Sequence, residues 1–236
     1  MNFDEPRRLE PEILDGLAAA DPRAQRSRTD LRRIHRAMGT LSIMQRALDR
    51  STASRRPHRL LEIGAGDGTL MLRLAQRQAV RWPALSVTLL DRVETVERQT
   101  LDGFVRLGWN PSMVTMDLFD WLKNVEDQRW DVVCASLFLH HLSSIELRRL
   151  LSYVASATDV FFCCEPRRSS LALLGSHLVG LLGAGPVTRA DAVASVHAGF
   201  SGLELTALWP NHTQWQLEEH AAGLFSHAFL AVRNQA

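Results

Sequence analysis

A glycine-rich turn between an apolar strand and a helix constrains the fold of this 236-residue chain more than any other feature. The segment Leu60–Leu70 reads Leu-Leu-Glu-Ile-Gly-Ala-Gly-Asp-Gly-Thr-Leu. Its glycines permit positive φ angles and leave room for a ligand against the backbone. A strand, such a turn and a helix N-terminus form nucleotide sites in α/β proteins. The spacing is G-x-G-x-G rather than the dinucleotide fingerprint G-x-G-x-x-G, so the turn indicates a nucleotide-type ligand without identifying it.

Short apolar strands alternate with helical patterns along most of the chain. We expect strands at residues 60–63, 85–90, 113–116, 131–135, 160–164, 203–209 and 227–232. We expect helices at residues 69–82, 93–107, 171–187 and 188–197. A further helix is expected behind a capping box at Ser143 and Glu146, with Leu147, Leu150, Leu151 and Val154 on its buried face. Such alternation predicts an α/β fold built on a doubly wound, mostly parallel, Rossmann-like sheet of seven strands.

The N-terminal residues 1–50 are predicted to form a helical arm or lid, and residues 51–236 the main domain. Apolar residues spaced three and four apart favour an amphipathic helix over 29–50, with Thr29 or Asp30 as its N-cap. Residues 1–60 hold 13 Arg against 8 Asp and Glu, a local charge of +5. Two readings stay open: a solvated arginine-rich face, or a lid that recognises an anionic ligand.

Composition narrows the classes of protein that fit. The net charge is only +1, which gives no reason to expect a nucleic-acid partner. The longest apolar run, residues 171–187, is short and broken by glycines, so we expect no integral membrane segment. The three cysteines, Cys134, Cys163 and Cys164, lie in strand-like runs and are expected to be buried thiols. With no visible secretory signal, these features predict a cytoplasmic protein whose oligomeric state stays open.

Three carboxylates follow or lie within the predicted strands. Glu62 lies in the first strand, Asp91 ends the second and Asp117 ends the third. In a doubly wound sheet the ligand lies across the carboxyl ends of the strands, so these side chains converge. Asp91 follows Gly64 by about the interval typical of a ribose-binding carboxylate, which accepts bonds from both hydroxyls. Asp117 can accept a hydrogen bond from the exocyclic amine of adenine.

The sequence resembles the class I S-adenosylmethionine-dependent methyltransferases. The matching segments are Leu60–Gly68, Val87–Asp91, residues 115–118 and Trp130–Ser136, and the resemblance extends over about residues 55–166. It implies S-adenosylmethionine as the cofactor and an antiparallel last strand in the sheet. It also assigns the cofactor-binding residues, which are Glu62, Gly64, Ala65, Gly66, Asp67, Asp91, Arg92, Asp117, Leu118 and Ser136.

The resemblance gives these residues separate roles. The turn from Gly64 to Asp67 would line the methionine part of the cofactor, and Glu62 would hold its amino group directly or through water. Asp91 would bind the ribose. Asp117 and the Leu118 backbone would hold the adenine. Ser136 would flank the sulfonium end.

The segment Leu137–Leu142 resembles the Leu-His-His-Leu segment of small-molecule methyltransferases of the ubiquinone and menaquinone type. Histidine titrates near neutral pH, so His140 or His141 is a candidate general base for a phenol or quinol hydroxyl. The alternative is that one or both histidines pack structurally beside the helix that Ser143 caps. Arg167 or Arg168 could hold an acidic group of the substrate, or form a surface pair.

The sequence lacks the Asn-Pro-Pro-Tyr or Asp-Pro-Pro-Tyr segment of amino-methylating enzymes, and its histidines show no metal-ligand spacing, so we expect no metal. The predicted function is methyl transfer to oxygen or carbon of a small hydrophobic acceptor, in secondary or lipid-quinone metabolism. Two alternatives remain. One is a non-catalytic module that binds S-adenosylmethionine, and the other is a different transferase on the same fold.

Overall fold

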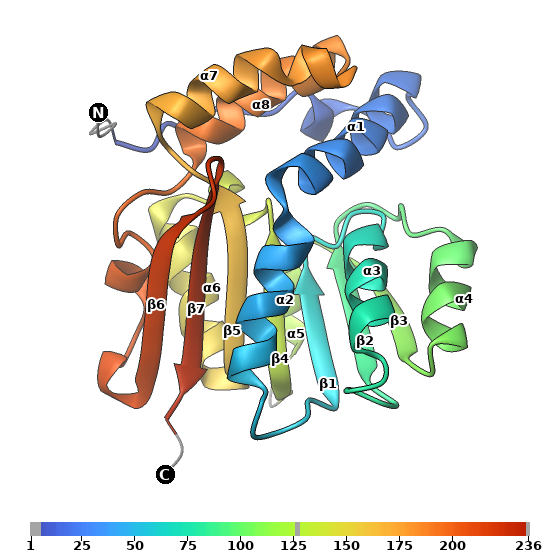
Figure 1. Ribbon diagram of the computed structural model, residues 1–236, viewed down its shortest axis with the longest axis vertical. Coiled ribbons are helices and arrows are strands. Elements are labelled where there is room, and N and C mark those ends of the chain that lie inside the picture. The colour runs from blue at the N-terminus through green and yellow to red at the C-terminus, as the bar shows by residue number, and fades with distance from the viewer. Residues whose placement is uncertain (1–5, 126–127, 235–236) are drawn as a thin grey trace.

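The computed structural model describes residues 6–125 and 128–234, so residues 1–5 of the predicted arm lie outside it. A seven-stranded sheet forms the centre of the molecule, in the order β3-β2-β1-β4-β5-β7-β6 (Figure 1). The strands are β1 (Arg59–Ile63), β2 (Ser86–Asp91), β3 (Asn110–Thr115), β4 (Trp130–Ser136), β5 (Thr158–Pro166), β6 (Trp215–Ala222) and β7 (Ser226–Arg233). The first five pair in parallel, and β7 runs antiparallel to both β5 and β6. The predicted Rossmann-like fold is therefore confirmed.

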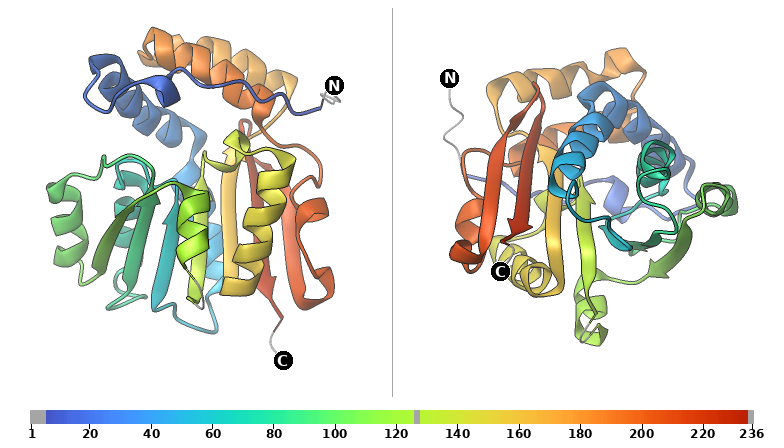
Figure 2. Two further views of the ribbon diagram at one scale, coloured as in Figure 1. Left: turned by 180° about the vertical axis from the view of Figure 1, so that it is seen from behind. Right: turned by 60° about the horizontal axis from the view of Figure 1, so that its bottom comes forward.

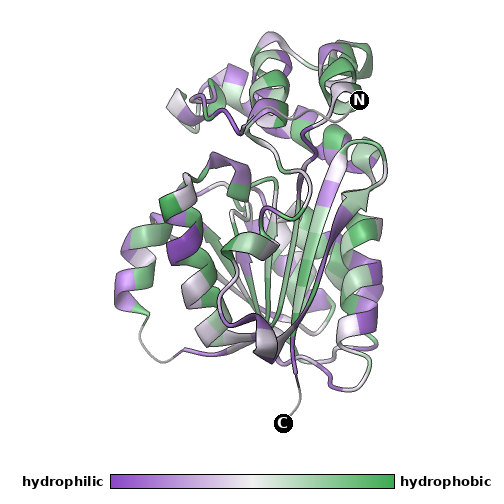
Figure 3. Cartoon of the chain, turned by 90° about the vertical axis from the view of Figure 1, so that its left-hand side faces the viewer, coloured by the Kyte–Doolittle hydropathy of each residue, from purple (hydrophilic) through white to green (hydrophobic). Residues whose placement is uncertain are grey.

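Helices cover both faces of the sheet. The helices on one face are α2 (Thr40–Ser51), α3 (Thr69–Gln78) and α4 (Arg98–Arg106), and those on the other are α5 (Leu118–Asn124) and α6 (Ser144–Ala157). Each face has its own apolar core, because the strands point alternate side chains to opposite sides. In Figure 3 the central strands are mostly hydrophobic, while the helices carry hydrophilic residues on their outer sides. The predicted capping box forms at α6, where Ser143 and Glu146 exchange hydrogen bonds.

A layer of helices, which we call the roof, lies over the carboxyl ends of the parallel strands (Figures 1 and 2). It consists of η1 (Leu14–Gly16), α1 (Pro22–Met38), α7 (Ser170–Leu178), η3 (Val179–Leu182) and α8 (Pro186–Ala198). Asp30 joins α1 to the start of α8, since its carboxylate accepts hydrogen bonds from Gly185 N at 2.8 Å and Thr188 Oγ1 at 3.1 Å. The roof closes over the edge of the sheet where the predicted ligand residues lie. Helix η2 (Leu139–His141) lies beneath it.

The predicted single helix over 29–50 is wrong, because the structure has two helices there. Gly39 adopts φ +69°, ends α1 and begins α2. Helix α1 starts earlier than expected, with Asp21 as its N-cap, and Asp30 lies buried within the helix. Helix α2 packs on the sheet through Leu41, Met44 and Leu48, whereas α1 belongs to the roof. The helix before Gly39 thus belongs to the roof, and the helix after it packs on the sheet.

The strand predicted at 203–209 is also wrong. That segment contains the short helix η4 (Thr206–Leu208), and its apolar residues Leu205 and Trp209 are buried in the core. The sixth strand is β6, a polar edge strand that follows η5 (His212–Gln214). Helix α8 begins at Pro186 rather than Thr188, which lies inside it. Within the described residues, no helix is long and apolar enough to cross a membrane.

Candidate functional site

A cavity of about 860 Å³ separates the roof from the carboxyl edge of the sheet. Residues from both layers line it. All ten residues predicted to bind the cofactor line this cavity, and so do His140 and His141. The roof supplies further lining side chains that the sequence did not single out, among them Glu12, Asp15 and His35. The structure thus brings the predicted residues together and adds a second set from the N-terminal segment.

The glycine turn follows β1 directly and is anchored to its neighbour. Gly64 N and Ala65 N donate to the carbonyl of Leu90 at 2.9 and 3.1 Å, so the turn is fixed to the end of β2. Gly66 adopts φ +54°, and a Cβ atom there would meet nothing within 4 Å. This glycine is therefore required by its backbone angle rather than by crowding. The open space beside it is where a ligand can approach the main chain.

Asp91 ties the turn to the second strand. Its Oδ2 accepts a hydrogen bond from Gly66 N at 2.8 Å, and its Oδ1 accepts one from Val93 N at 3.0 Å. A carboxylate has about four acceptor positions, so two stay available to a ligand with paired hydroxyls. Asp117 caps α5, and both of its backbone bonds, from Phe119 and Asp120, end on Oδ1. The second carboxylate oxygen of Asp117, Oδ2, takes no part in these two hydrogen bonds.

Glu62 is fully enclosed beneath the glycine turn. Its side chain is buried, and Oε2 has no hydrogen-bond partner among the residues that the structure describes. Burial raises the pKa of Glu62 well above its ordinary value, and the nearby carboxylates of Asp67 and Asp91 add to the effect. Ser136 Oγ, at the end of β4, is also buried without a partner in the described part of the chain. Both atoms are free to form hydrogen bonds with a bound ligand.

Two other predicted residues are engaged by the roof. Asp67 pairs through Oδ2 with Arg32 of α1 at 2.8 Å and accepts from Thr69 through Oδ1. Arg92 pairs with Asp15 at 2.6 Å. Both ion pairs join the N-terminal segment to the carboxyl edge of the sheet. They hold the roof against the glycine turn and leave these two side chains only partly available to a ligand.

His140 is held between two carboxylates. Its Nδ1 lies 2.8 Å from Glu165 of β5, and its Nε2 lies 3.4 Å from Glu12. The imidazole is buried, which by itself would lower its pKa, but the hydrogen bonds and charges of Glu12 and Glu165 raise the pKa of His140 to about 9. His140 is therefore an imidazolium at neutral pH, with both ring nitrogens occupied.

His141 is in the opposite state. Its ring centroid is 4.2 Å from that of His140, and Nδ1 lies 3.6 Å from Asp15. Burial and the charge of His140 lower the pKa of His141 below its ordinary value. At neutral pH this imidazole is uncharged and able to accept a proton. Two adjacent histidines thus differ in charge because their neighbours differ.

The N-terminal segment supplies what sequence reasoning missed. Glu12, His140 and His141 bring their side-chain nitrogen and oxygen atoms within 4.8 Å of one another, although the sequence predicted no metal-ligand set. In the structure Glu12 is hydrogen-bonded to His140 Nε2 and also accepts a hydrogen bond from Ser195 of α8. His35 of α1 lines the cavity with its Nδ1 buried and without a partner within the described ranges. Burial lowers the pKa of His35 to about 4, so this ring is neutral.

The two arginines after β5 are not in the cavity. Arg168 is buried and donates to Gly199 O at 2.7 Å, to Ser201 and to both carboxylate oxygens of Glu204. Arg167 forms an isolated bridge to Phe200. Neither lines the cavity, so the interpretation that they hold an acidic substrate group is wrong for the described cavity. Arg168 instead fixes the chain between α8 and η4.

Comparison with known families agrees with this geometry. A family described as "Methyltransferase domain" matches residues 31–224, most of the chain. The chain therefore belongs to the methyltransferase domain family. This membership confirms the enzyme class predicted from the sequence, a methyltransferase. No curated protein matches the chain significantly by sequence.

Solved structures share the fold at low sequence identity. The plantazolicin methyltransferase BpumL, in complex with a monoazolic desmethylPZN analog and SAH, is 14% identical with a TM-score of 0.64, over 91% of this chain and 92% of that one. An O-methyltransferase family protein from Burkholderia thailandensis is 17% identical with a TM-score of 0.61, over 91% and 61%. The magnesium protoporphyrin IX methyltransferase of Synechocystis PCC 6803, with bound SAH, is 17% identical with a TM-score of 0.53, over 84% and 83%.

Proposed function

We propose that this protein transfers a methyl group from S-adenosylmethionine to the hydroxyl oxygen of a small, apolar, aromatic acceptor such as a phenol or quinol. The observation that carries the proposal is the position of His141 in the same cavity as the glycine turn, where burial and the charge of His140 lower its pKa. Related proteins point the same way: the Synechocystis methyltransferase contains bound SAH, and another structural relative is an O-methyltransferase family protein. We place the enzyme in the cytoplasm and in secondary or lipid-quinone metabolism.

The buried polar atoms of the site suit the donor. S-adenosylmethionine supplies an electrophilic methyl group on a positively charged sulfur. Glu62, whose Oε2 lacks a partner in the described residues, would receive the donor's ammonium group, which relieves the cost of a buried carboxylate. Asp91 would accept from the ribose hydroxyls with its remaining acceptor positions, and Asp117 with Leu118 would hold the adenine. Ser136 would face the sulfonium end.

His141 is the general base in this proposal. Its Nδ1 faces Asp15, which orients the ring and leaves Nε2 to take the proton from the acceptor hydroxyl. His140 is a positioning residue, because both of its nitrogens are already bonded and its pKa is too high for a base at neutral pH. Its positive charge keeps His141 neutral. Glu12 and Glu165 in turn maintain that charge.

The acceptor would occupy the part of the cavity beneath the roof. Leu31, Met38, Leu142, Val179 and Phe225 contribute apolar lining, whereas the carboxylates gather around the glycine turn. This division of the lining suits a polar methyl donor at the glycine turn and an apolar acceptor beneath the roof. By covering the carboxyl edge of the sheet, the roof would limit the access of water to the reacting groups, which would strengthen their electrostatic interactions.

Two measurements separate donor binding from catalysis. Calorimetry with S-adenosylmethionine should show binding to the wild type and a severe loss in Asp91→Ala, whose backbone-anchoring carboxylate is removed. Turnover with a phenol and quinol panel, followed by product NMR, should show an O-methyl product. His141→Ala should lower kcat at least about a hundredfold, as loss of a general base does. His58→Ala, an exposed histidine before β1, is the matched control and should leave kcat unchanged.

The outcomes discriminate between the alternatives. Donor binding without turnover on any acceptor would indicate a binding module, and a C-methyl product would move the reaction to carbon. Full turnover in His141→Ala would rule out this base. Because hydrogen bonds to Glu165 and Glu12 occupy both ring nitrogens of His140, we also expect turnover to be unaffected by EDTA.

A further inference from the structure

The roof exposes a row of leucines that the proposed chemistry does not use. Leu171, Leu174 and Leu178 of α7 recur at helical spacing, and Leu181 and Leu182 of η3 continue the row. Their exposed fractions are 46%, 58%, 50%, 83% and 47%. The opposite side of α7 is buried through Ala172 and Ser176, so the helix is seated and its leucine face points outward. We call this row the leucine face.

The leucine face is continuous with the cavity. Leu178, Leu181 and Leu182 line the cavity and are also about half exposed or more, so they lie at its mouth. The leucine face therefore extends to the mouth of the cavity. A contiguous apolar patch at the mouth of a site is typical of a surface that meets another apolar phase.

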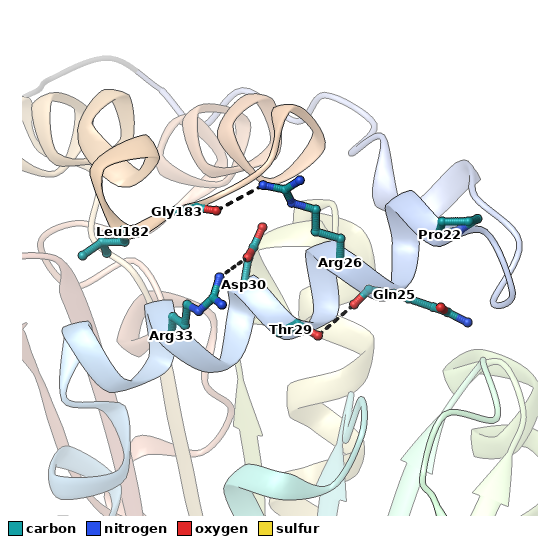
Figure 4. A pocket seen from close by; sticks show the side chains of 8 residues that line it. All are labelled: Pro22, Gln25, Arg26, Thr29, Asp30, Arg33, Leu182 and Gly183. Carbon is teal, nitrogen blue, oxygen red and sulfur yellow. Dashed lines mark hydrogen bonds and ion pairs between the residues drawn. The ribbon is translucent and has the colours of Figure 1, made fainter.

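Basic side chains surround the end of this face. Figure 4 shows Arg26 and Arg33 of α1 beside Leu182 and Gly183. Arg33 pairs with Asp30, whereas Arg26 donates to the Gly183 carbonyl and has no carboxylate partner in this view. Arg189 of α8 packs close to Gly180 of η3. Residues 166–190 contain no aspartate or glutamate. The roof thus combines exposed leucines with positive charge, although the whole chain has a net charge of only +1.

We propose that the leucine face and its arginine rim dock the protein on an anionic phospholipid surface. Leucines inserted at the headgroup boundary and arginines facing anionic lipids are the two contributions by which interfacial helices bind membranes. A second protein copy would bury the leucines but would bring a second arginine rim against the first. Charge complementarity therefore favours lipid. Docking would place the mouth of the cavity against the layer in which an apolar acceptor dissolves, and this last step alone rests on the proposed function.

Vesicle co-sedimentation tests the docking without donor or acceptor, so its failure is separate from failure of the proposed function. We expect the full chain to bind vesicles of phosphatidylcholine and phosphatidylglycerol (equal parts) and to bind pure phosphatidylcholine weakly. Leu174→Glu and Leu181→Glu should each weaken partitioning at least about tenfold. Each change removes a leucine that would insert into the lipid, and adds a negative charge that the anionic headgroups repel. Arg26→Gln and Arg189→Gln should each weaken it about fivefold, and high salt should remove that difference.

A matched control guards against a general effect of charge. Val80→Glu changes a residue that is 96% exposed just after α3, at the opposite edge of the sheet, and should leave vesicle binding unchanged. Thermal melts of every variant check the fold. Binding that is equal on neutral and anionic vesicles, or that survives Leu174→Glu, would overturn the proposal. So would light scattering that shows a dimer which Leu174→Glu separates, since the leucine face would then belong to a second copy.

Discussion

Replacing His140 with glutamine should raise the pKa of His141. The imidazolium of His140 lies with its ring centroid 4.2 Å from that of His141, and its charge is one cause of the lowered pKa of His141. Glutamine keeps a hydrogen-bonding side chain beside Glu165 but has no charge. The carboxylates of Glu12 and Glu165, no longer neutralised by His140, would stabilise the protonated form of His141 further.

The size of the shift follows from the distance. Two unit charges about 4 Å apart interact by about 1 kcal/mol in water and by about 4 kcal/mol at the effective dielectric constant of a protein surface. At about 1.4 kcal/mol per pH unit, this corresponds to a rise of roughly 0.7 to 3 units. Because the His141 side chain is 28% exposed, solvent screens the pair, and we expect a rise of about one unit.

Proton NMR of the histidine Cε1–H resonances measures this pKa directly. The His141 resonance is assigned by its absence from His141→Asn. The acid limb of the kcat/KM profile should move upward by the same amount, since the base must be deprotonated to act. His58→Gln removes an exposed histidine before β1 and should leave the resonance unmoved. A pKa of His141 that stays constant or falls in His140→Gln would refute the electrostatic coupling.

Three further perturbations test other parts of the structure. Glu62→Gln should weaken binding of S-adenosylmethionine by calorimetry while leaving the free protein at least as stable at pH 8, because burial disfavours the ionised carboxylate. Gly64→Ala should lose about 1–3 kcal/mol more unfolding free energy in urea than the control Gly108→Ala. Both glycines have a positive φ, but only at Gly64 would an added Cβ clash with the Phe138 side chain, at 2.4 Å. The pKa of His140 is raised in the folded protein, so protonated His140 stabilises the folded state fully below pH 6.5, and this stabilisation is lost as pH rises toward 9. Thermal melts over this range should show a loss of unfolding free energy of at most about 3 kcal/mol. His140→Gln should remove this pH dependence.

The sequence predicted the parallel half of the molecule well, because its signals are local. Strands β1, β2, β4 and β5 are largely buried and appear as apolar runs, and the glycine turn has a characteristic spacing. The polar edge strand β6 lacked that signal. It exposes Glu218 and His220 while Glu219 pairs with His227, so its alternation does not stand out in the sequence. The more regular pattern at 203–209 predicts a strand in its place.

The candidate site divides in the same way. Strand-end carboxylates could be predicted because topology alone brings them to one edge of the sheet. Glu12 and Asp15 could not, since their contacts with His140 and His141 join positions more than a hundred residues apart and leave no local pattern. The contrast in charge between the two histidines depends on those contacts. Only the assembled structure distinguishes the candidate base from its neighbour.

The hydrogen bonds that Asp30 accepts from Gly185 and Thr188 also determine when the cavity can close. Their partners are separated by 155 and 158 positions, so a growing chain contains α1 long before it contains α8. Until α8 has been synthesised, Asp30 has only Arg33 of its own helix as a partner, and the sheet edge stays open to water. Closing so long a loop is also entropically costly and slow. The cavity is therefore completed late in folding, after the two apolar cores on the faces of the sheet have begun to assemble.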